Sequence, residues 1–177
     1  MGALEPLVED VRENLGLRGQ DNIGWIVSIE RGIELDADHE QMFRVLLNLT
    51  RNAMQALLAL APNDPVRDQI RVTGRREGAV VVIEVSDTGP GLSRKAREHL
   101  FEAVQGSTRT GGGGLGLAIA AELVRAHGGE IRLVDGTIGA TFRFTIPDRA
   151  VDLGTQRDQR ARAPPHRAAG RLRASPV

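Results

Sequence analysis

Three amide side chains stand at helical spacing in the segment NLTRNAMQAL, residues 48–57. Asn48, Asn52 and Gln55 occupy positions i, i+4 and i+7, so they share one face of a helix with apolar residues on either side. Amides in apolar surroundings cost free energy unless a partner satisfies them. Amide oxygens suit Mg²⁺, a hard ion that keeps several waters and takes phosphate oxygens as ligands. The spacing therefore indicates a magnesium–phosphate site, with ordinary surface amides as the alternative.

A carboxylate followed by two glycines ends an apolar run in the segment VSDTGPGL, residues 85–92. Asp87 stands where a central strand is expected to stop. A carboxylate at that position can accept a hydrogen bond from an exocyclic amine, such as the amino group of adenine. Gly89 and Gly91 leave room for a flat ring beside it. The alternative interpretation is a capped tight turn that binds nothing.

Four consecutive glycines precede an apolar helical pattern in the segment TRTGGGGLGL. Gly111, Gly113 and Gly116 satisfy G-x-G-x-x-G, but no apolar strand precedes them and no G-K-[ST] ends the run, so neither a dinucleotide turn nor a P-loop is indicated. A glycine-rich loop at a helix N-terminus remains, where N–H groups and the helix dipole attract phosphate. Arg109 can neutralise a terminal phosphate. We expect residues 101–113 to move as a lid, with slack surface chain as the alternative.

The elements that must hold these residues follow from hydrophobic periodicity. Helices are expected at residues 3–15, 39–61, 93–100 and 114–127. Strands are expected at residues 22–30, 32–38, 69–76, 79–87, 130–135 and 140–147. The second strand is expected to pair with the first, and the third with the fourth as a hairpin. Helices packed on one face of a mixed sheet make an α+β two-layer sandwich.

Composition is that of one globular domain with a tail. Apolar residues make up 41% and charged residues 26% of the 177 residues. There is no cysteine, which excludes disulfides and thiolate metal sites. The sequence has neither a signal-peptide pattern nor an apolar run of the ~20 residues that span a bilayer, so we expect a cytoplasmic domain, and a membrane-anchored parent protein stays open. Residues 149–177 carry seven arginines and two aspartates and are expected to be a disordered basic tail rather than a nucleic-acid-binding segment.

In order and spacing, these motifs resemble the ATP-binding domain of sensor histidine kinases, within the superfamily that includes gyrase, the MutL repair ATPases and heat-shock chaperones. VLLNLTRNAMQAL resembles the N box, VSDTGPG the G1 box, LFEAV the F box and GGGGLGLAI the G2 box. The NAMQAL form is similar to that of the nitrogen-regulation type. The resemblance covers about residues 3–147 and implies the Bergerat fold with a mobile ATP lid.

The resemblance also implies a role for each matched residue. Asn52 would be the Mg²⁺ ligand, with Asn48 supporting the ion or the phosphates. Asp87 would bind the adenine amino group. Arg109 stands where many relatives have a lid lysine. The other nucleotide contacts that the resemblance implies are Gln55, Gly89, Gly91, Gly112, Gly114, Leu115, Gly116 and Leu117.

A histidine kinase of this kind phosphorylates a histidine in an H-[ED]-x-x-x-P setting on a dimerisation helix. None of the four histidines meets this pattern, since His39 has Arg44 where proline is required. The chain is therefore expected to be the ATP-binding part alone. Residues 1–20 would be a connector helix from a dimerisation domain, 21–148 the ATP-binding domain and 149–177 the tail. The fragment would be a monomer, and its parent a homodimer that passes phosphoryl to a response regulator.

Three other classes of protein share part of this pattern. A serine kinase of the anti-sigma-factor type usually has a glutamate where Asn48 stands. The ATP hydrolases of the superfamily use such a glutamate to activate water, and an amide is no base. A phosphotransfer adaptor that no longer binds ATP would have an eroded G1 or G2 box, and both are intact here.

Overall fold

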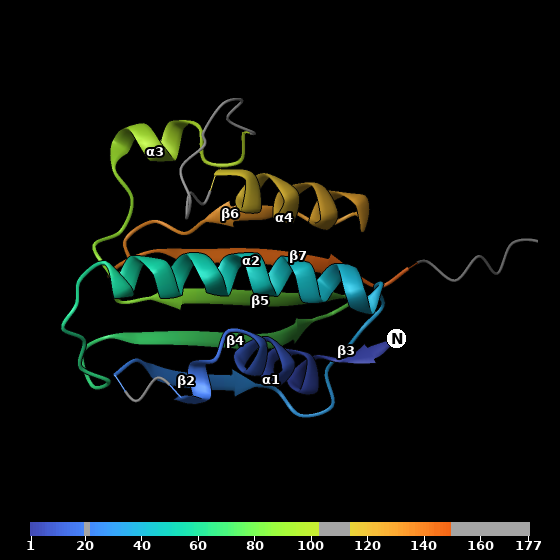
Figure 1. The fold of residues 1–177 in the computed structure, drawn as a ribbon. Helices are drawn as coiled ribbons and strands as arrows, with labels where there is room; N and C mark the ends of the chain where they lie inside the picture. Colours follow the sequence, from blue (N-terminus) through green and yellow to red (C-terminus); the bar gives the residue numbers. More distant parts are fainter. Residues whose placement is uncertain (20–21, 103–113, 150–177) are drawn as a thin grey trace, which may run out of the picture.

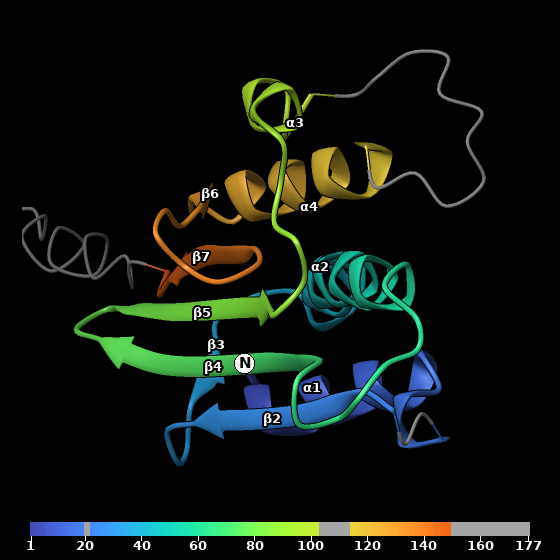
Figure 2. The ribbon, with the colours of Figure 1, turned by 90° about the vertical axis from the view of Figure 1, so that its left-hand side faces the viewer.

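The computed structural model describes residues 1–19, 22–102 and 114–149, and its main feature is a five-stranded sheet. Figure 1 shows α1, α2 and α4 lying across one face of this sheet, and Figure 2 shows the short α3 beyond α4, away from the sheet. The helices are α1 (Leu4–Asn14), α2 (His39–Leu58), α3 (Arg94–Glu98) and α4 (Gly114–Ala126), with a 3₁₀ turn at Leu17–Gly19. The strands are β1 (Gly2–Ala3), β2 (Gly24–Ile29), β3 (Glu34–Leu35), β4 (Gln69–Glu77), β5 (Val80–Asp87), β6 (Ile131–Leu133) and β7 (Thr141–Pro147).

The large sheet is mixed, with strand order β2-β4-β5-β7-β6. β2 runs parallel to β4, and α2 lies in the connection between them, as a parallel pair requires a long crossover. The remaining neighbours are antiparallel. β4 and β5 form the expected hairpin, which turns at Gly78 with φ +61°. This is the α+β two-layer sandwich that the sequence predicts, with β5 at its centre.

The apolar face of α2 forms the middle of the core. The helix begins after Asp38, whose carboxylate accepts a hydrogen bond from the backbone N–H of Gln41 at 2.8 Å. Its buried side chains recur every three or four residues: Met42, Val45, Leu46, Leu49, Ala53 and Leu57. Alternate side chains of β5 join the same core, namely Val81, Ile83 and Val85. Val82, Glu84 and Ser86 project to the other face of the sheet, where Glu84 and Ser86 are half-buried and Val82 is buried.

α1 is part of this core. Leu4, Leu7, Val8 and Val11 are all buried in the same cluster as the apolar face of α2. A side chain at Gly74 of β4 would meet Leu4, since a Cβ there would lie 2.6 Å from Leu4 Cδ2. The glycine therefore lets α1 sit close to the sheet. The connector role expected of residues 1–20 stays a prediction.

One expected strand pairing is wrong. β3 pairs with the unforeseen β1 rather than with β2, which lies at the edge of the large sheet beside β4. The physical reason is the burial of Leu35, which is 2% exposed and covered when the chain start pairs with it. Arg76 holds the same segment, because its guanidinium donates to the carbonyl of Glu34 at 3.0 Å.

The described residues include the start of the chain and the first residue of the expected tail, Arg149. Among these, no helix is both long and apolar enough to cross a bilayer. Arg149 donates from its backbone N–H to the Asp36 carboxylate at 2.8 Å. The rest of the expected tail, and most of the expected lid, lie outside the described residues.

Replacing Leu4 by alanine tests whether α1 belongs to the folding unit. Leu4 is fully buried, and the cavity left by such a change costs about 2–5 kcal/mol of unfolding free energy. Leu60, with 44% of its surface exposed, is the matched control, and Leu60→Ala should cost less than about 0.5 kcal/mol. Urea denaturation followed by circular dichroism gives both values. Equally small losses would contradict the inclusion of α1 in the core.

Candidate functional site

Three of the sequence motifs meet at one end of the domain. This is the end of the sheet where β5 stops, and there the C-terminal half of α2 and the first turn of α4 lie close by (Figure 1). A Cβ at Gly89 would lie 3.6 Å from the Cβ of Ala56 on α2. A Cβ at Gly116 would lie 3.1 Å from Asn48 Oδ1, also on α2. The turn after β5 and the start of α4 therefore both contact α2, as the motif spacing requires.

Asp87 is a buried carboxylate at the end of β5. Only 6% of its surface is exposed. Its Oδ1 accepts hydrogen bonds from the backbone N–H of Gly89 at 2.8 Å and of Ala140 at 3.4 Å. Burial raises the pKa of Asp87 above its usual value, and the two backbone donors offset part of that rise. Among the described residues no protein group donates to Oδ2, so this oxygen remains an acceptor for a ligand.

Three glycines form a close cradle around this carboxylate. A Cβ at Gly89 would approach Asp87 Oδ1 to 2.9 Å, and one at Gly139 would approach the Asp87 carbonyl oxygen to 2.1 Å. Gly139 has φ +70°, and Gly91 has φ +75°. A Cβ at Gly91 would lie 3.1 Å from the carbonyl of Gly139. Sequence reasoning missed Gly139, although a glycine just before the last strand in GTIGA was an available signal.

The three amides of α2 are half-buried and have no side-chain hydrogen bond to any described residue. Asn48 faces the first turn of α4, where a side chain at position 116 would crowd it, because a Cβ there would lie 3.1 Å from Asn48 Oδ1. Asn52 and Gln55 follow on the same helix. Unpaired amides beside a helix N-terminus are a suitable lining for a phosphate group and its counter-ion.

The two leucines that flank Gly116 on α4 differ in their surroundings. Leu117 is 5% exposed and belongs to the core, whereas Leu115 is 64% exposed. Gly114 is the first residue of the helix. Arg109 and Gly112 lie outside the described residues. Their roles, like the nucleotide contacts expected of the other site residues, stay predictions.

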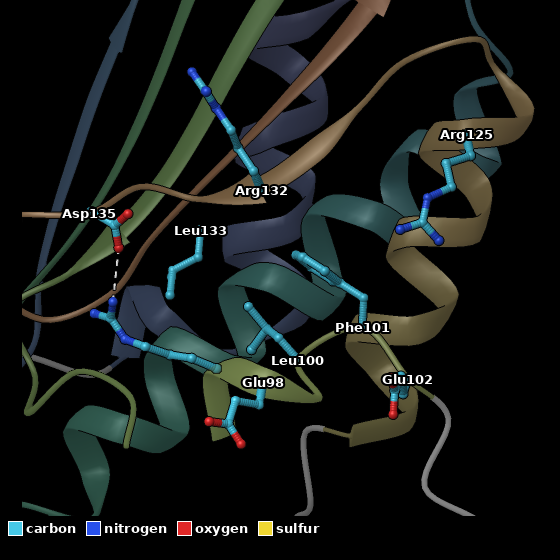
Figure 3. A pocket seen from close by; sticks show the side chains of 9 residues that line it. Glu98, Leu100, Phe101, Glu102, Arg125, Arg132, Leu133 and Asp135 are labelled. Carbon is cyan, nitrogen blue, oxygen red and sulfur yellow. Dashed lines mark hydrogen bonds and ion pairs between the residues drawn. The ribbon is translucent and has the colours of Figure 1, made fainter. Parts of the chain in front are cut away.

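Away from these motifs, a groove of about 530 Å³ lies between α3, α4 and β6 (Figure 3). Leu100 and Phe101 line it, and an ion pair of 2.9 Å joins Arg97 to Asp135 at its side. The Phe101 ring packs edge-on against Phe142 of β7, with ring centres 6.2 Å apart. Phe101 is the first residue of the expected lid, and this contact anchors it to the core.

The fold and this arrangement of side chains can be compared with known proteins. Residues 37–150 match the model of the family described as "Histidine kinase-, DNA gyrase B-, and HSP90-like ATPase". The chain belongs to this family. Within it, the chain is a catalytic ATPase domain of the sensor histidine kinase type.

Individual relatives agree with this assignment. The chain is 34% identical over 155 residues to the sensor protein FixL of Bradyrhizobium diazoefficiens, covering 82% of this chain and 28% of FixL. It is 32% identical over 152 residues to the sensory histidine kinase/phosphatase NtrB of Salmonella typhimurium, covering 83% of this chain and 43% of NtrB. The catalytic domain of histidine kinase ThkA superposes with TM-score 0.69 at 26% identity, covering 82% of this chain and 92% of ThkA's. The chain thus spans less than half of these two curated relatives.

The raised pKa of Asp87 predicts a specific dependence of stability on pH. The folded domain binds this proton more readily than the unfolded chain, so Asp87 lowers the unfolding free energy at neutral pH. That penalty disappears as the pH falls through the raised pKa. Asp87→Asn keeps an oxygen for the N–H groups of Gly89 and Ala140, so it should be as stable as wild type or more so at pH 7. The advantage should shrink on acidification.

Urea denaturation of both proteins between pH 7 and pH 4 measures the difference. Asp135→Asn is the control, because Asp135 has 87% of its side chain exposed. If the difference in unfolding free energy between wild type and Asp87→Asn does not change with pH, Asp87 does not have a raised pKa in the folded domain.

Proposed function

We propose that this domain binds ATP with Mg²⁺ between Asp87, the amides of α2 and the start of α4, and presents the γ-phosphoryl group to a histidine of a dimerisation domain. The observation that carries the proposal is the arrangement at Asp87. A carboxylate with only 6% of its surface exposed has one oxygen satisfied by backbone N–H groups and the other unpaired. Such an oxygen can accept a hydrogen bond from an exocyclic amine.

Asp87 would select adenine by the direction of its hydrogen bond. The adenine amino group donates to the free Oδ2, whereas guanine has a carbonyl at the equivalent ring position and would face the carboxylate with a second acceptor. A site built to pair one polar group strongly rejects the analogue that lacks it. The cradle of Gly89, Gly91 and Gly139 leaves the space beside the carboxylate clear for the ring.

The phosphate end would lie between α2 and α4. Asn52 would hold Mg²⁺ through its amide oxygen, and Asn48 and Gln55 would support the ion or the phosphate oxygens. The bound ion would neutralise charge on the β- and γ-phosphates during transfer. Gly114 and Gly116 would turn backbone N–H groups toward the phosphates at the N-terminus of α4. The roles predicted for Arg109 and Gly112 complete this part of the proposal.

The positions of the described histidines support an acceptor on another domain. His39 begins α2, ~20 Å along the helix from Asn52 at 1.5 Å per residue. His127 lies at the same end, since its Nε2 accepts from the backbone N–H of Asp38 at 3.3 Å. His99 pairs with Glu102 at 2.8 Å. Asn48 stands where a hydrolase would need a general base, which favours phosphoryl transfer to histidine over transfer to water.

The proposal extends to the rest of the signalling reaction. The dimerisation domain would belong to the same parent protein, a homodimer, and residues 1–20 would lead to it through the buried helix α1. The phosphohistidine would then pass its phosphoryl group to an aspartate of a response regulator. A cytoplasmic location, where ATP and the regulator are available, is part of this proposal.

Isothermal titration calorimetry with Mg-ATP tests the binding site. A hydrogen bond to a charged group contributes about 1.5–3 kcal/mol, so Asp87→Asn should weaken ATP binding by about 10- to 100-fold. Asn52→Ala should remove most of the dependence of affinity on Mg²⁺. Asp135→Asn, at the side of the groove between α3, α4 and β6, should bind as wild type. Unchanged affinity in Asp87→Asn would contradict the proposed adenine contact.

Radiolabelled ATP tests the location of the acceptor. The isolated chain should bind γ-labelled ATP but gain almost no acid-labile label, because its described histidines lie away from the site. The variants His39→Ala, His99→Ala and His127→Ala should retain ATP affinity. Strong self-labelling that one of these substitutions abolishes would place the acceptor within the chain and contradict the proposal.

A further inference from the structure

A second buried carboxylate lies under the loop between α2 and β4, outside every motif considered above. Asp68 is 2% exposed and ends the loop. Its Oδ2 accepts from the backbone N–H of Asp64 at 2.9 Å and from Asn63 Nδ2 at 3.1 Å. Arg67 donates to both of its oxygens, at 3.1 Å from Nε and 2.9 Å from Nη2. Arg67 holds the pKa of Asp68 well below its usual range, with further help from the Asp64 N–H, so the carboxylate stays charged throughout any binding assay.

This cluster is joined to the turn that follows Asp87. The hydroxyl of Thr88 donates to the carbonyl of Arg67 at 2.8 Å and accepts from the backbone N–H of Gln69 at 2.9 Å. The backbone N–H of Thr88 donates to the carbonyl of Gln69 at 3.2 Å. A hydroxyl has a single proton to donate, so the donor capacity of Thr88 is fully used by the loop. The side chain of Thr88 therefore serves as a tie between the loop and the turn.

The cluster is joined to α2 as well. Asn63 donates to the carbonyl of Leu57, in the last turn of α2, at 2.7 Å, with the same amide nitrogen that contacts Asp68. Leu57 in turn lies against the turn after β5, because a Cβ at Gly89 would be 3.7 Å from its Cδ2. The contacts form a closed ring that runs from Leu57 through Asn63, Asp68, Arg67 and Thr88 to Gly89, and back to Leu57.

From this ring we infer that Asp68 is a positioning residue for base recognition, which acts through Thr88 to fix the Asp87–Gly89 turn relative to the amides of α2. The inference rests on the proposed function, since it concerns how the adenine contact is oriented. Asp68 itself touches no part of the proposed nucleotide. Its charge orders the loop, the Arg67 carbonyl then receives the Thr88 hydroxyl, and the Asp87 carboxylate is held at a constant distance from the phosphate-binding amides.

The first test is the selectivity for the base. In Asp68→Asn the neutral amide can no longer accept from all four donors, so the turn loosens and the ratio of ATP to GTP affinity should fall by at least about fivefold. Leu4→Ala is the control for stability, because it destabilises the domain at a distance and should leave this ratio unchanged. An unchanged ratio in Asp68→Asn would overturn the inference and leave Asp68 with a structural role only.

A double-mutant cycle identifies the route through Thr88. Thr88→Val removes the hydroxyl and retains the branched shape. If Asp68 acts through this hydroxyl, Asp68→Asn should change the ATP:GTP ratio in the wild-type background and have little further effect in Thr88→Val. Additive effects would show that Asp68 acts by another route and would overturn the inference. Should Asp68→Asn fail to fold, Arg67→Met replaces it in the cycle. This change removes two of the four donors to Asp68 from an exposed side chain, and the ATP:GTP ratio should fall less than in Asp68→Asn.

A measurement without nucleotide separates this inference from the proposed function. Amide hydrogen exchange at Thr88 and Gly89 should be about tenfold faster in Asp68→Asn than in wild type, while exchange in the middle of α2 is unchanged. If both amides keep their normal protection in Asp68→Asn and this variant binds ATP as wild type does, the inference is overturned and the proposed function stands. Failure of the wild-type chain to bind ATP, whatever the exchange rates, would overturn the proposed function and this inference with it.

Discussion

The burial of the Asp87 carboxylate is the constraint on which the rest of the structure depends. A charge removed from water is costly unless it is paired or hydrogen-bonded. Here two backbone N–H groups satisfy one oxygen and leave the other unpaired among the described residues, and we propose that it accepts from the base. Keeping that second oxygen both unpaired and accessible requires a rigid surrounding, because a loose turn would fold the carboxylate onto another donor.

The fold supplies this rigidity from three directions. β5 is the central strand, held on both sides by antiparallel neighbours, so its last residue cannot shift independently. Gly139 lets the loop before β7 lie directly on the Asp87 carbonyl. The α2–β4 loop is organised by Asp68 and ties the turn after β5 to the end of α2. The same helix carries the amides at the proposed phosphate end, so one rigid unit sets the distance between the two ends of the site.

The sequence predicted those features that are determined locally. The helix α2 and the β4–β5 hairpin have strong periodicity, and the box motifs are contiguous, so each was identified without tertiary information. The pairing of β1 with β3 was not foreseen, because it joins residues over thirty positions apart through strands of two residues each. Gly139 and Asp68 were also missed. Gly139 has a local signal, a glycine just before the last strand, but its contact with Asp87 forms only in the folded domain. Asp68 belongs to no motif, and its burial under Arg67 and the loop depends on the fold.

The most direct test of the account is the titration of Asp87 itself, followed by the ¹³C NMR signal of its carboxyl group with and without Mg-ATP. The free domain should show a pKa above the usual value for an aspartate, as burial requires. Because only the ionised carboxylate accepts the adenine amino group well, bound ATP should lower the pKa of Asp87. A pKa that stays unchanged or rises on addition of ATP would contradict the claim that this carboxylate recognises the base.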